Sequence, residues 1–208
     1  MSQLNVDTIG SQTSTSVSVA SGHTLKDSSN KAFITNTGMT FIAGADSTTQ
    51  ASSLSVDNVF SSTYDVYKIF IFGNTANANS CQIQFRMRAG GSDATSTYKG
   101  LREYANIGAS GLSHGSDTGS SYWYIGDITS SQPQESGFEI TLHKPYLAQH
   151  TNFMSIGSSA WSDSAFYLQR AYGLETSNTQ FDGFTILPIN GSHTFNLAYR
   201  VYGLSDSL

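Results

Sequence analysis

Residues 181–203, FDGFTILPINGSHTFNLAYRVYG, hold the clearest strand pattern in the chain. From residue 194 to 202, bulky apolar side chains alternate with polar or small ones, a period of two that is typical of a strand with one buried face. The residues of the apolar face are Phe195, Leu197, Tyr199 and Val201. A second run, residues 184–187, comes before it across a turn in which the pair Asn190-Gly191 favours positive φ. The pattern predicts a closing β-hairpin that completes a sheet formed by earlier parts of the chain.

The rest of the chain contains further short strand-like runs separated by turn-forming residues. Residues 66–72, VYKIFIF, are apolar on both faces and predict a central strand, whereas residues 81–88 alternate and predict a strand with one solvated face. The weaker run at residues 102–107 fits a short helix or an edge strand. The other runs are residues 122–128, 138–142, 153–156 and 165–172. With the closing pair, about eight or nine strands indicate an all-β fold, an antiparallel two-sheet β-sandwich of jelly-roll type.

The composition favours a folded β protein with an uncharged polar surface. Only 12% of the 208 residues are charged, and about a quarter are Ser or Thr. Aromatic residues make up another 12%, which supplies apolar area to bury and argues against disorder. We therefore expect a surface of hydroxyl and amide groups around an aromatic-rich core.

Charge and hydropathy exclude several classes of partner. A net charge of −5 with scattered Lys and Arg argues against nucleic-acid binding, which needs clustered basic residues. No apolar run approaches the length of a membrane-spanning helix. The first residues, MSQLNVDTIG, lack the basic and apolar regions of a secretory signal. We expect synthesis in a cytoplasm, no export by a standard signal and no membrane insertion.

Residues 1–50 differ from residues 51–208 and predict a separate N-terminal arm before the sandwich. Their strand-like pieces are too short and too poor in apolar residues to form a core of their own. Their spaced apolar residues favour ordering by contact with sister chains or with a larger assembly, and a disordered tail is the alternative. The candidate attachment and oligomerisation residues are Leu4, Val6, Ile9, Val17 and Val19.

Signals of catalysis or of metal and cofactor binding are missing from the sequence. It contains no GxSxG, HExxH, Walker or GxGxxG motif, and its acidic residues do not form a calcium loop. The single cysteine, Cys81, lies on the apolar side of an alternating run, where a buried structural thiol is expected. We therefore predict a protein that is not an enzyme and has no catalytic residue, cofactor or metal.

Four aromatic residues are candidates for contact with a surface or a glycan: Tyr122, Trp123, Tyr124 and Trp161. Strand alternation places Tyr122 and Tyr124 on one face and Trp123 on the other, so one of these faces is expected to point outward. Trp161 lies in the polar segment SSAWSDS, where an indole is less easily explained as core. Exposed aromatic rings beside polar groups bind sugars or protein partners, although packing within the sandwich is the commoner role.

Several segments give the chain a resemblance to virion proteins of tailed phages that infect aquatic bacteria, including cyanobacteria. At the N-terminus, residues 4–9, 15–19 and 21–25 resemble the openings of such proteins, which commonly precede fibre or appendage domains. The body is similar to a β-rich domain of the same phages. The matching segments there are residues 59–69, 85–93, 181–188 and 200–203. The closing strand departs from the usual Gly/Thr-rich version, because residues 196–199 (NLAY) are bulkier.

The resemblance implies a virion structural protein, commonly a homotrimer, whose partners are other virion proteins of the tail or capsid. It implies no catalytic residues and leaves the position on the particle open. The first hypothesis is a tail fibre or appendage protein that is attached through residues 1–50 and displays the sandwich toward host surface glycans. A head decoration (cement) protein that stabilises the capsid is the alternative. A glycan-binding lectin or polysaccharide-active enzyme is the second alternative.

Overall fold

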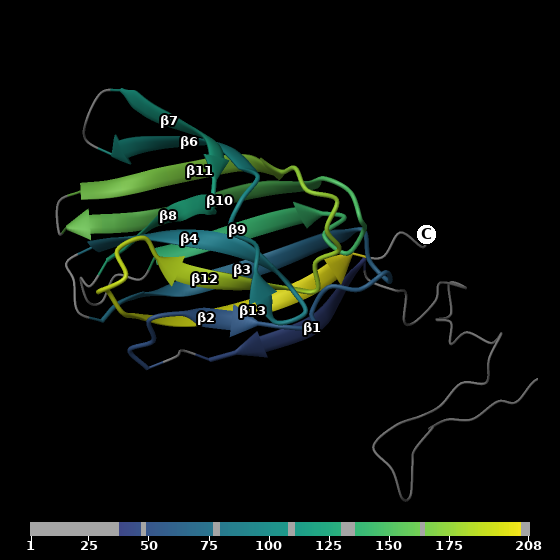
Figure 1. Ribbon diagram of the computed structural model, residues 1–208. Helices are drawn as coiled ribbons and strands as arrows, with labels where there is room; N and C mark the ends of the chain where they lie inside the picture. The colour runs from purple at the N-terminus through teal and green to yellow at the C-terminus, as the bar shows by residue number, and fades with distance from the viewer. Residues whose placement is uncertain are drawn as a thin grey trace, which may run out of the picture. The chain divides into compact units, whose positions relative to one another are not determined.

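The structure is a computed structural model (Figure 1). It describes residues 38–46, 49–76, 80–107, 111–129, 136–162 and 165–204, without the side chains of residues 107 and 160–165. The chain divides into two units, Met1–Thr37 and Gly38–Leu208, and all described residues belong to the second. The candidate attachment residues Leu4, Val6, Ile9, Val17 and Val19 lie outside the described residues.

All regular structure in the described part of the chain is β-strand, so none of it forms a helix that could cross a membrane. Every strand pairing is antiparallel. The strands are β1 Met39–Ala45, β2 Leu54–Val56, β3 Val66–Thr75, β4 Ser80–Ala89, β5 Ser92–Asp93, β6 Tyr98–Ile107, β7 Leu112–Ser120, β8 Trp123–Thr129, β9 Ser136–His143, β10 Thr151–Ser162, β11 Ala165–Glu175, β12 Gly183–Pro188 and β13 Phe195–Leu204.

The strands form two sheets that pack face to face (Figure 1). The large sheet has eight strands in the order β1-β13-β3-β9-β10-β11-β6-β7. The small sheet has five strands. Four of them follow the order β2-β12-β4-β5, and the fifth, β8, pairs with the first half of β4 along the edge whose far end pairs with β5. The prediction of an all-β, two-sheet antiparallel sandwich is confirmed, and the jelly-roll connectivity and the N-terminal arm remain predictions.

The closing segment is not a hairpin, and this prediction was wrong. β12 pairs with β2 and β4 in the small sheet, whereas β13 pairs with β1 and β3 in the large sheet. The connection crosses from one sheet to the other, and the Ser192 N–H donates to the Asn190 side chain in a local turn. Neither Asn190 nor Gly191 has a positive φ. The predicted alternation of β13 is confirmed in part: Phe195, Leu197 and Val201 are fully buried, whereas Tyr199 is only half-buried and Ala198, on the other face, is also buried.

A stack of aromatic rings joins the two sheets at the centre of the core. Phe85 stacks on Phe184 within the small sheet, with ring centroids 5.1 Å apart. Trp123 of β8 stacks on Phe153 of the large sheet at 4.7 Å and meets the edge of Tyr98 at 4.9 Å. These contacts extend the hydrophobic core from one sheet to the other, and burial of each large ring contributes a few kcal/mol.

Gly173 of β11 makes room for the indole at this position. A Cβ atom there would lie 2.2 Å from Trp123 Nε1, closer than any van der Waals contact allows. The indole N–H instead donates to the Lys99 carbonyl oxygen at 3.2 Å. Because Gly173 has no side chain, the Trp123 indole can lie flat against the large sheet at this position.

The sandwich begins earlier in the chain than residue 51. β1, which the sequence placed in the arm, lies at the edge of the large sheet and pairs with β13 from Met39↔Leu204 to Ala45↔Tyr199. The Arg200 guanidinium fastens the end of β1 by donating to the Ala45 carbonyl at 2.7 Å. The boundary between the two units therefore lies at residue 37, not near residue 50.

Two strands at the other end of the large sheet differ from expectation. The segment at residues 102–107 belongs to β6, an interior strand between β11 and β7, and is neither a helix nor an edge strand. β7, LSHGSDTGS, has no apolar period and was not predicted. Because β7 is the edge strand and is mostly exposed, backbone pairing with β6 holds it in the sheet, and its side chains supply no pattern to detect.

Candidate functional site

Trp123, one of the four aromatic candidates, is a core residue. Its side chain is 2% exposed and lies between Phe153 and Tyr98. It therefore offers no surface to a ligand, and this part of the expectation was wrong. The physical reason is that β8 is covered on both faces, so alternation along this strand does not separate inside from outside.

The other three candidates have different positions. Trp161 lies in β10, and its side chain is outside the described residues. Tyr122 is half-buried in the bend before β8. Tyr124 is buried at the side of β8 that faces β6 and β11, where its ring contributes to a pocket.

This pocket, of about 190 Å³, is the candidate functional site. Its lining comes from four strands and was not found by sequence reasoning beyond Tyr124. The lining residues are Gln82 of β4, Arg102 and Tyr104 of β6, Tyr124 and Asp127 of β8, and Tyr167 of β11. The only local signal in the sequence was the alternation of β6, which places Arg102 and Tyr104 on one face.

The unequal widths of the two sheets explain why a pocket forms here. β8 is an outer strand of the small sheet and pairs with β4 alone, whereas the large sheet continues past β11 to β6 and β7. The inner faces of β6 and β11 therefore extend past the edge of β8. Tyr104, on that inner face, is 38% exposed, and its ring meets Tyr167 edge-on at 6.1 Å.

Gln169 of β11 closes the free edge of β8 with its side chain. Its Oε1 accepts a hydrogen bond from the Asp127 backbone N–H at 2.9 Å, and its Nε2 donates to Ser159 Oγ at 2.6 Å. The amide therefore satisfies a strand-edge donor that has no neighbouring strand. Because Oε1 must face the N–H, the orientation of the amide is fixed by its partners.

Tyr124 and Asp127 form a short, mostly buried contact. The Tyr124 hydroxyl donates to Asp127 Oδ2 at 2.5 Å and lies 2.8 Å from Gln169 Oε1. Burial raises the pKa of the Asp127 carboxyl, and hydrogen bonds from Tyr124, Gln82 and Gln169 and the charge of Arg102 oppose this shift. Burial also raises the pKa of the Tyr124 hydroxyl.

Arg102 is the cation of the pocket. Its guanidinium carbon lies 4.9 Å from the centre of the Tyr124 ring, a cation–π arrangement. It forms no ion pair with any other residue that the structure describes. β7 leaves space beside it, because a Cβ atom on Gly115 would lie 2.8 Å from Arg102 Nε. The donors of this guanidinium are thus available to a ligand.

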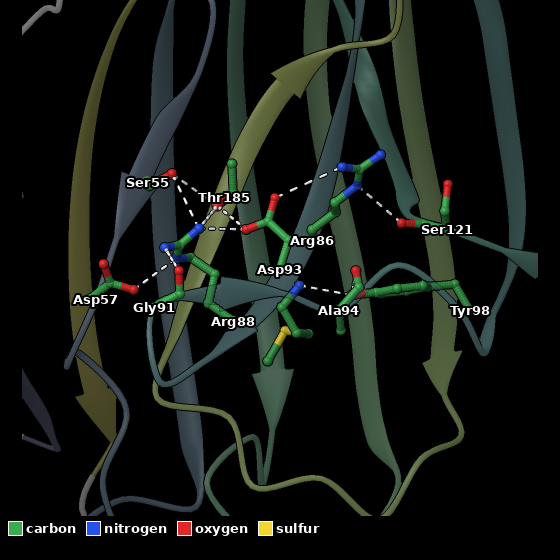
Figure 2. A network of polar contacts seen from close by, with 11 residues as sticks. Ser55, Asp57, Arg86, Arg88, Gly91, Asp93, Ala94, Tyr98, Ser121 and Thr185 are labelled. Carbon is green, nitrogen blue, oxygen red and sulfur yellow. Dashed lines mark hydrogen bonds and ion pairs between the residues drawn. The ribbon is translucent and has the colours of Figure 1, made fainter.

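A second polar cluster, on the outer face of the small sheet, is centred on Arg88 (Figure 2). The Arg88 guanidinium, 12% exposed, pairs with Asp57 at 2.7 Å and Asp93 at 2.5 Å and donates to Thr185 Oγ1 at 3.0 Å. Arg86 adds a longer ion pair to Asp93 at 3.8 Å. The hydrogen bond that Arg88 donates to Asp57 raises the pKa of Arg88. Since the partners satisfy each other and join β4, β5 and β12 to the residue after β2, this cluster holds the sheet together.

The outer face of the large sheet carries the third feature, an apolar surface termed the outer patch. Its side chains come from four adjacent strands, β10, β11, β6 and β7. Those of β10 and β11 alternate with buried residues and so point away from the small sheet, and strand register places Leu101 and Leu112 on the same face. The outer patch consists of Leu101, Leu112, Met154, Ile156, Phe166, Leu168 and Tyr172, all exposed. Strand register aligns Met154, Tyr172 and Leu101 in one row across three strands.

Charged residues of both signs accompany the outer patch. Arg170 lies opposite Glu103 between its apolar rows, and Lys68 pairs with Glu139 on the neighbouring strands β3 and β9. A hollow of about 200 Å³ lies in this face, lined in part by Leu112, Ile156 and Leu168.

No group of three or more His, Cys, Asp or Glu side chains among the described residues could hold a metal ion. Cys81 is buried, as predicted, and burial raises the pKa of its thiol to about 11. The thiol is therefore protonated at neutral pH and is a poor nucleophile.

Comparison with known proteins finds no relative of the chain. No protein-family model, curated protein or solved structure matches the chain significantly. A proposal of function is therefore supported by the geometry of the sandwich and by the sequence resemblance alone.

Proposed function

We propose that the chain is a non-enzymatic structural protein of a phage particle, a tail fibre or appendage component that self-associates through the outer patch. In this proposal the N-terminal region attaches the protein to the particle, and the sandwich is displayed toward the host surface. The resemblance supplies the virion assignment and the expectation of a homotrimer. The outer patch is the structural observation that carries the proposal.

The size of the exposed apolar surface supports an assembled state. A soluble monomer rarely exposes contiguous apolar patches larger than about 300–600 Å². Four strands about 4.8 Å apart, each with about 27 Å of paired length, give the outer patch roughly 500 Å², in the upper part of that range, and all eight strands give the whole outer face roughly 1,000 Å². A stable interface buries about 800 Å² on each partner, so this face is large enough for one.

A second copy of the same chain is the partner that fits this surface. The charges beside the outer patch include both signs, Arg170 with Glu103 and Lys68 with Glu139, and such a surface can complement itself. A strongly basic or acidic partner would leave half of these charges unmatched. The hollow beside Leu112 and Leu168 offers a place for an apolar side chain from the sister subunit.

The test is the position and number of copies of the protein on intact particles. Electron cryomicroscopy should place a small number of copies at the tail, in contact with each other through the outer face of the large sheet. Hundreds of copies spread over the head would favour the cement alternative, and absence from the particle would reject the virion assignment.

A truncation tests the role assigned to the N-terminal region. A chain that lacks residues 2–37 keeps β1 and should fold, because the strands of the sandwich begin at Met39. We expect this truncated protein to be soluble but absent from particles. Incorporation at the wild-type level would contradict attachment through this region.

A further inference from the structure

The outer face of the large sheet carries a second apolar group at the end opposite the outer patch, which we term the aromatic surface. It comes from β1, β13 and β3, on the far side of the sheet from β6 and β7 (Figure 1). Its β3 residues alternate with fully buried ones and so point away from the small sheet. The aromatic surface consists of Phe41, Phe70, Phe72 and Tyr202, of which Phe41 and Phe72 are 56% and 38% exposed. The rings of Phe41 and Phe70 meet Tyr202 edge-on at 5.6 and 5.8 Å.

The outer patch alone is too small for a stable interface. Its area of roughly 500 Å² falls short of the about 800 Å² that each partner buries, whereas the whole outer face offers roughly 1,000 Å². A partner that covers the outer patch stably therefore has to cover the aromatic surface as well.

Two symmetric arrangements bring the outer faces of two copies into contact. A twisted sheet is saddle-shaped, and a two-fold axis in the plane of the sheet maps the saddle onto itself when it runs parallel or perpendicular to the strands. A parallel axis between β9 and β10, the middle of the sheet, reverses the strand order. The aromatic surface of each copy then covers the outer patch of the other. A perpendicular axis keeps the strand order, so each strand faces its own equivalent.

The charges in the middle row of the outer face decide between these axes. Strand register forms this row from Arg200, Phe70, Glu139, Ile156, Arg170 and Glu103, in that order from β13 to β6. A perpendicular axis along the row would place Glu103, Glu139 and Arg170 each opposite the same charge of the other copy, which opposes association. The parallel axis places Phe70 against Arg170, a cation–π arrangement, and sets no two like charges of the described residues opposite each other.

The parallel axis also gives the hollow in the outer patch an occupant. The hollow of about 200 Å³ lies beside Leu112 and Leu168. Register places Leu168 and Phe72 in one row of the outer face, on β11 and β3, which are each third from opposite ends of the sheet. Reversal of the strand order therefore brings Phe72 of one copy over Leu168 of the other, at the mouth of the hollow.

We propose that a second copy of the chain covers the outer patch about a two-fold axis parallel to the strands, with the Phe72 ring of each copy in the hollow beside Leu168 of the other. This arrangement rests on the proposed function, because it is one form of self-association through the outer patch. It gives the aromatic surface a partner, the outer patch of the sister copy. Because a two-fold contact closes with two copies, a dimer is expected, whereas the resemblance implies a trimer.

Cross-linking between single-site cysteine variants of the full-length chain tests the axis. Phe72→Cys and Leu168→Cys proteins are mixed and treated with a short bismaleimide, and intact mass spectrometry separates the mixed dimer from the two like dimers. We expect the mixed dimer to predominate, because these positions meet across the interface. A mixture of Leu168→Cys with Tyr172→Cys is the control, since these positions meet only about the perpendicular axis. The natural Cys81 is buried and should not react.

A truncation of the inserted ring tests the hollow. Phe72→Ala should raise the Kd of the dimer roughly 30-fold, because each dimer contains two such rings and each loses the burial of its exposed part. Sedimentation velocity across a concentration series measures this change. Tyr104→Ala is the matched control and should leave the Kd unchanged, because Tyr104 is equally exposed (38%) but lines the pocket on the inner face of β6. Circular dichroism should show that both variants fold.

The possible outcomes separate this arrangement from the proposed function. A wild-type protein that stays monomeric at tens of micromolar, or an assembly that Leu112→Glu/Leu168→Glu does not disturb, overturns both. If the wild type assembles and this double variant dissociates it, self-association through the outer patch stands. The two-fold arrangement alone is then overturned by the mass of a trimer in place of twice 22.4 kDa, by a mixed dimer no more abundant than in the Tyr172→Cys control, or by an unchanged Kd in Phe72→Ala.

Discussion

Replacing two leucines of the outer patch tests the assembly surface with little expected effect on the fold. Leu112 of β7 and Leu168 of β11 are 62% and 55% exposed, and register aligns them across Ala105 of the strand between them. In the double variant Leu112→Glu/Leu168→Glu, the two carboxylates would lie within the proposed interface. Because both positions are exposed, the folding stability should change by no more than about 0.5 kcal/mol per site.

The expected loss follows from the area that these side chains still expose. Full burial of a leucine contributes about 1.5–3 kcal/mol, and about half of each side chain is already covered within the subunit. Association would then gain roughly 1 kcal/mol from each leucine, or about 2 kcal/mol for each subunit surface. This corresponds to a Kd at least about 30-fold weaker, before the cost of placing carboxylates in a dry interface is added.

Sedimentation velocity and light scattering across a concentration series measure the effect. The wild-type protein should sediment as an oligomer with a mass that is a multiple of 22.4 kDa, and the double variant should shift toward the monomer. Leu147→Glu is the control, since Leu147 is also exposed (37%) but lies in the turn after β9, away from the outer patch. A wild-type protein that stays monomeric at tens of micromolar, or a double variant with unchanged mass, would refute the reasoning.

Three further predictions concern the stability of the sandwich. Asp127→Asn should stabilise the protein more at pH 8 than at pH 4. Because the pKa of Asp127 is raised in the folded state, its contribution to stability is complete below the unfolded pKa of about 3.9 and is lost as the pH rises through the folded pKa. Thermal denaturation at both pH values measures the difference. Arg88→Lys should lower the free energy of unfolding by about 1–3 kcal/mol in urea titrations, because lysine cannot satisfy Asp57, Asp93 and Thr185 together. Gly173→Ala should cost about 1–3 kcal/mol in the same assay, because its Cβ overlaps the Trp123 indole.

Each of these predictions has a matched control in the chain. Asp117→Asn changes an exposed carboxyl and should change the stability by no more than about 0.5 kcal/mol. Arg200→Lys affects a pair with Asp46, which is 94% exposed, and a solvent-exposed hydrogen bond to the Ala45 carbonyl, and should cost at most about 1 kcal/mol. Gly137→Ala adds a Cβ with no atom within 4 Å. If a control changes stability as much as its partner variant, the corresponding argument fails.

Local sequence patterns predicted strands well and their partners poorly. The alternation of β4 and β13 identified their buried faces, because one face of each strand meets the core. The same pattern does not encode which strand lies beside which. β12 and β13 are adjacent in the chain, yet they belong to different sheets, a result that depends on the widths and packing of both sheets.

The candidate site was largely beyond sequence reasoning for a related reason. Its residues come from four strands between Gln82 and Tyr167, and none belongs to a motif. Tyr124 was chosen as an aromatic candidate, but its contact with Asp127 accompanies an irregular register of β8 beside β4, and Arg102 comes near only when β8 lies against β6. The expectation that one face of residues 122–124 points outward failed for both Trp123 and Tyr124, because alternation indicates exposure only for strands with one solvated face.

The position of β1 has a consequence for the order in which the protein folds. Among the strands that the structure describes, β1 pairs only with β13, and the contact between Ala45 and Arg200 spans 155 residues of sequence. During synthesis β1 therefore remains without its partner until nearly the whole sandwich has emerged from the ribosome. Contacts of such long range slow folding, because the chain must close a large loop before it gains any pairing energy. A chain that ends at Ser192 should leave both β1 and β3 with an unpaired edge, and pulse proteolysis of nascent chains would detect the late closure.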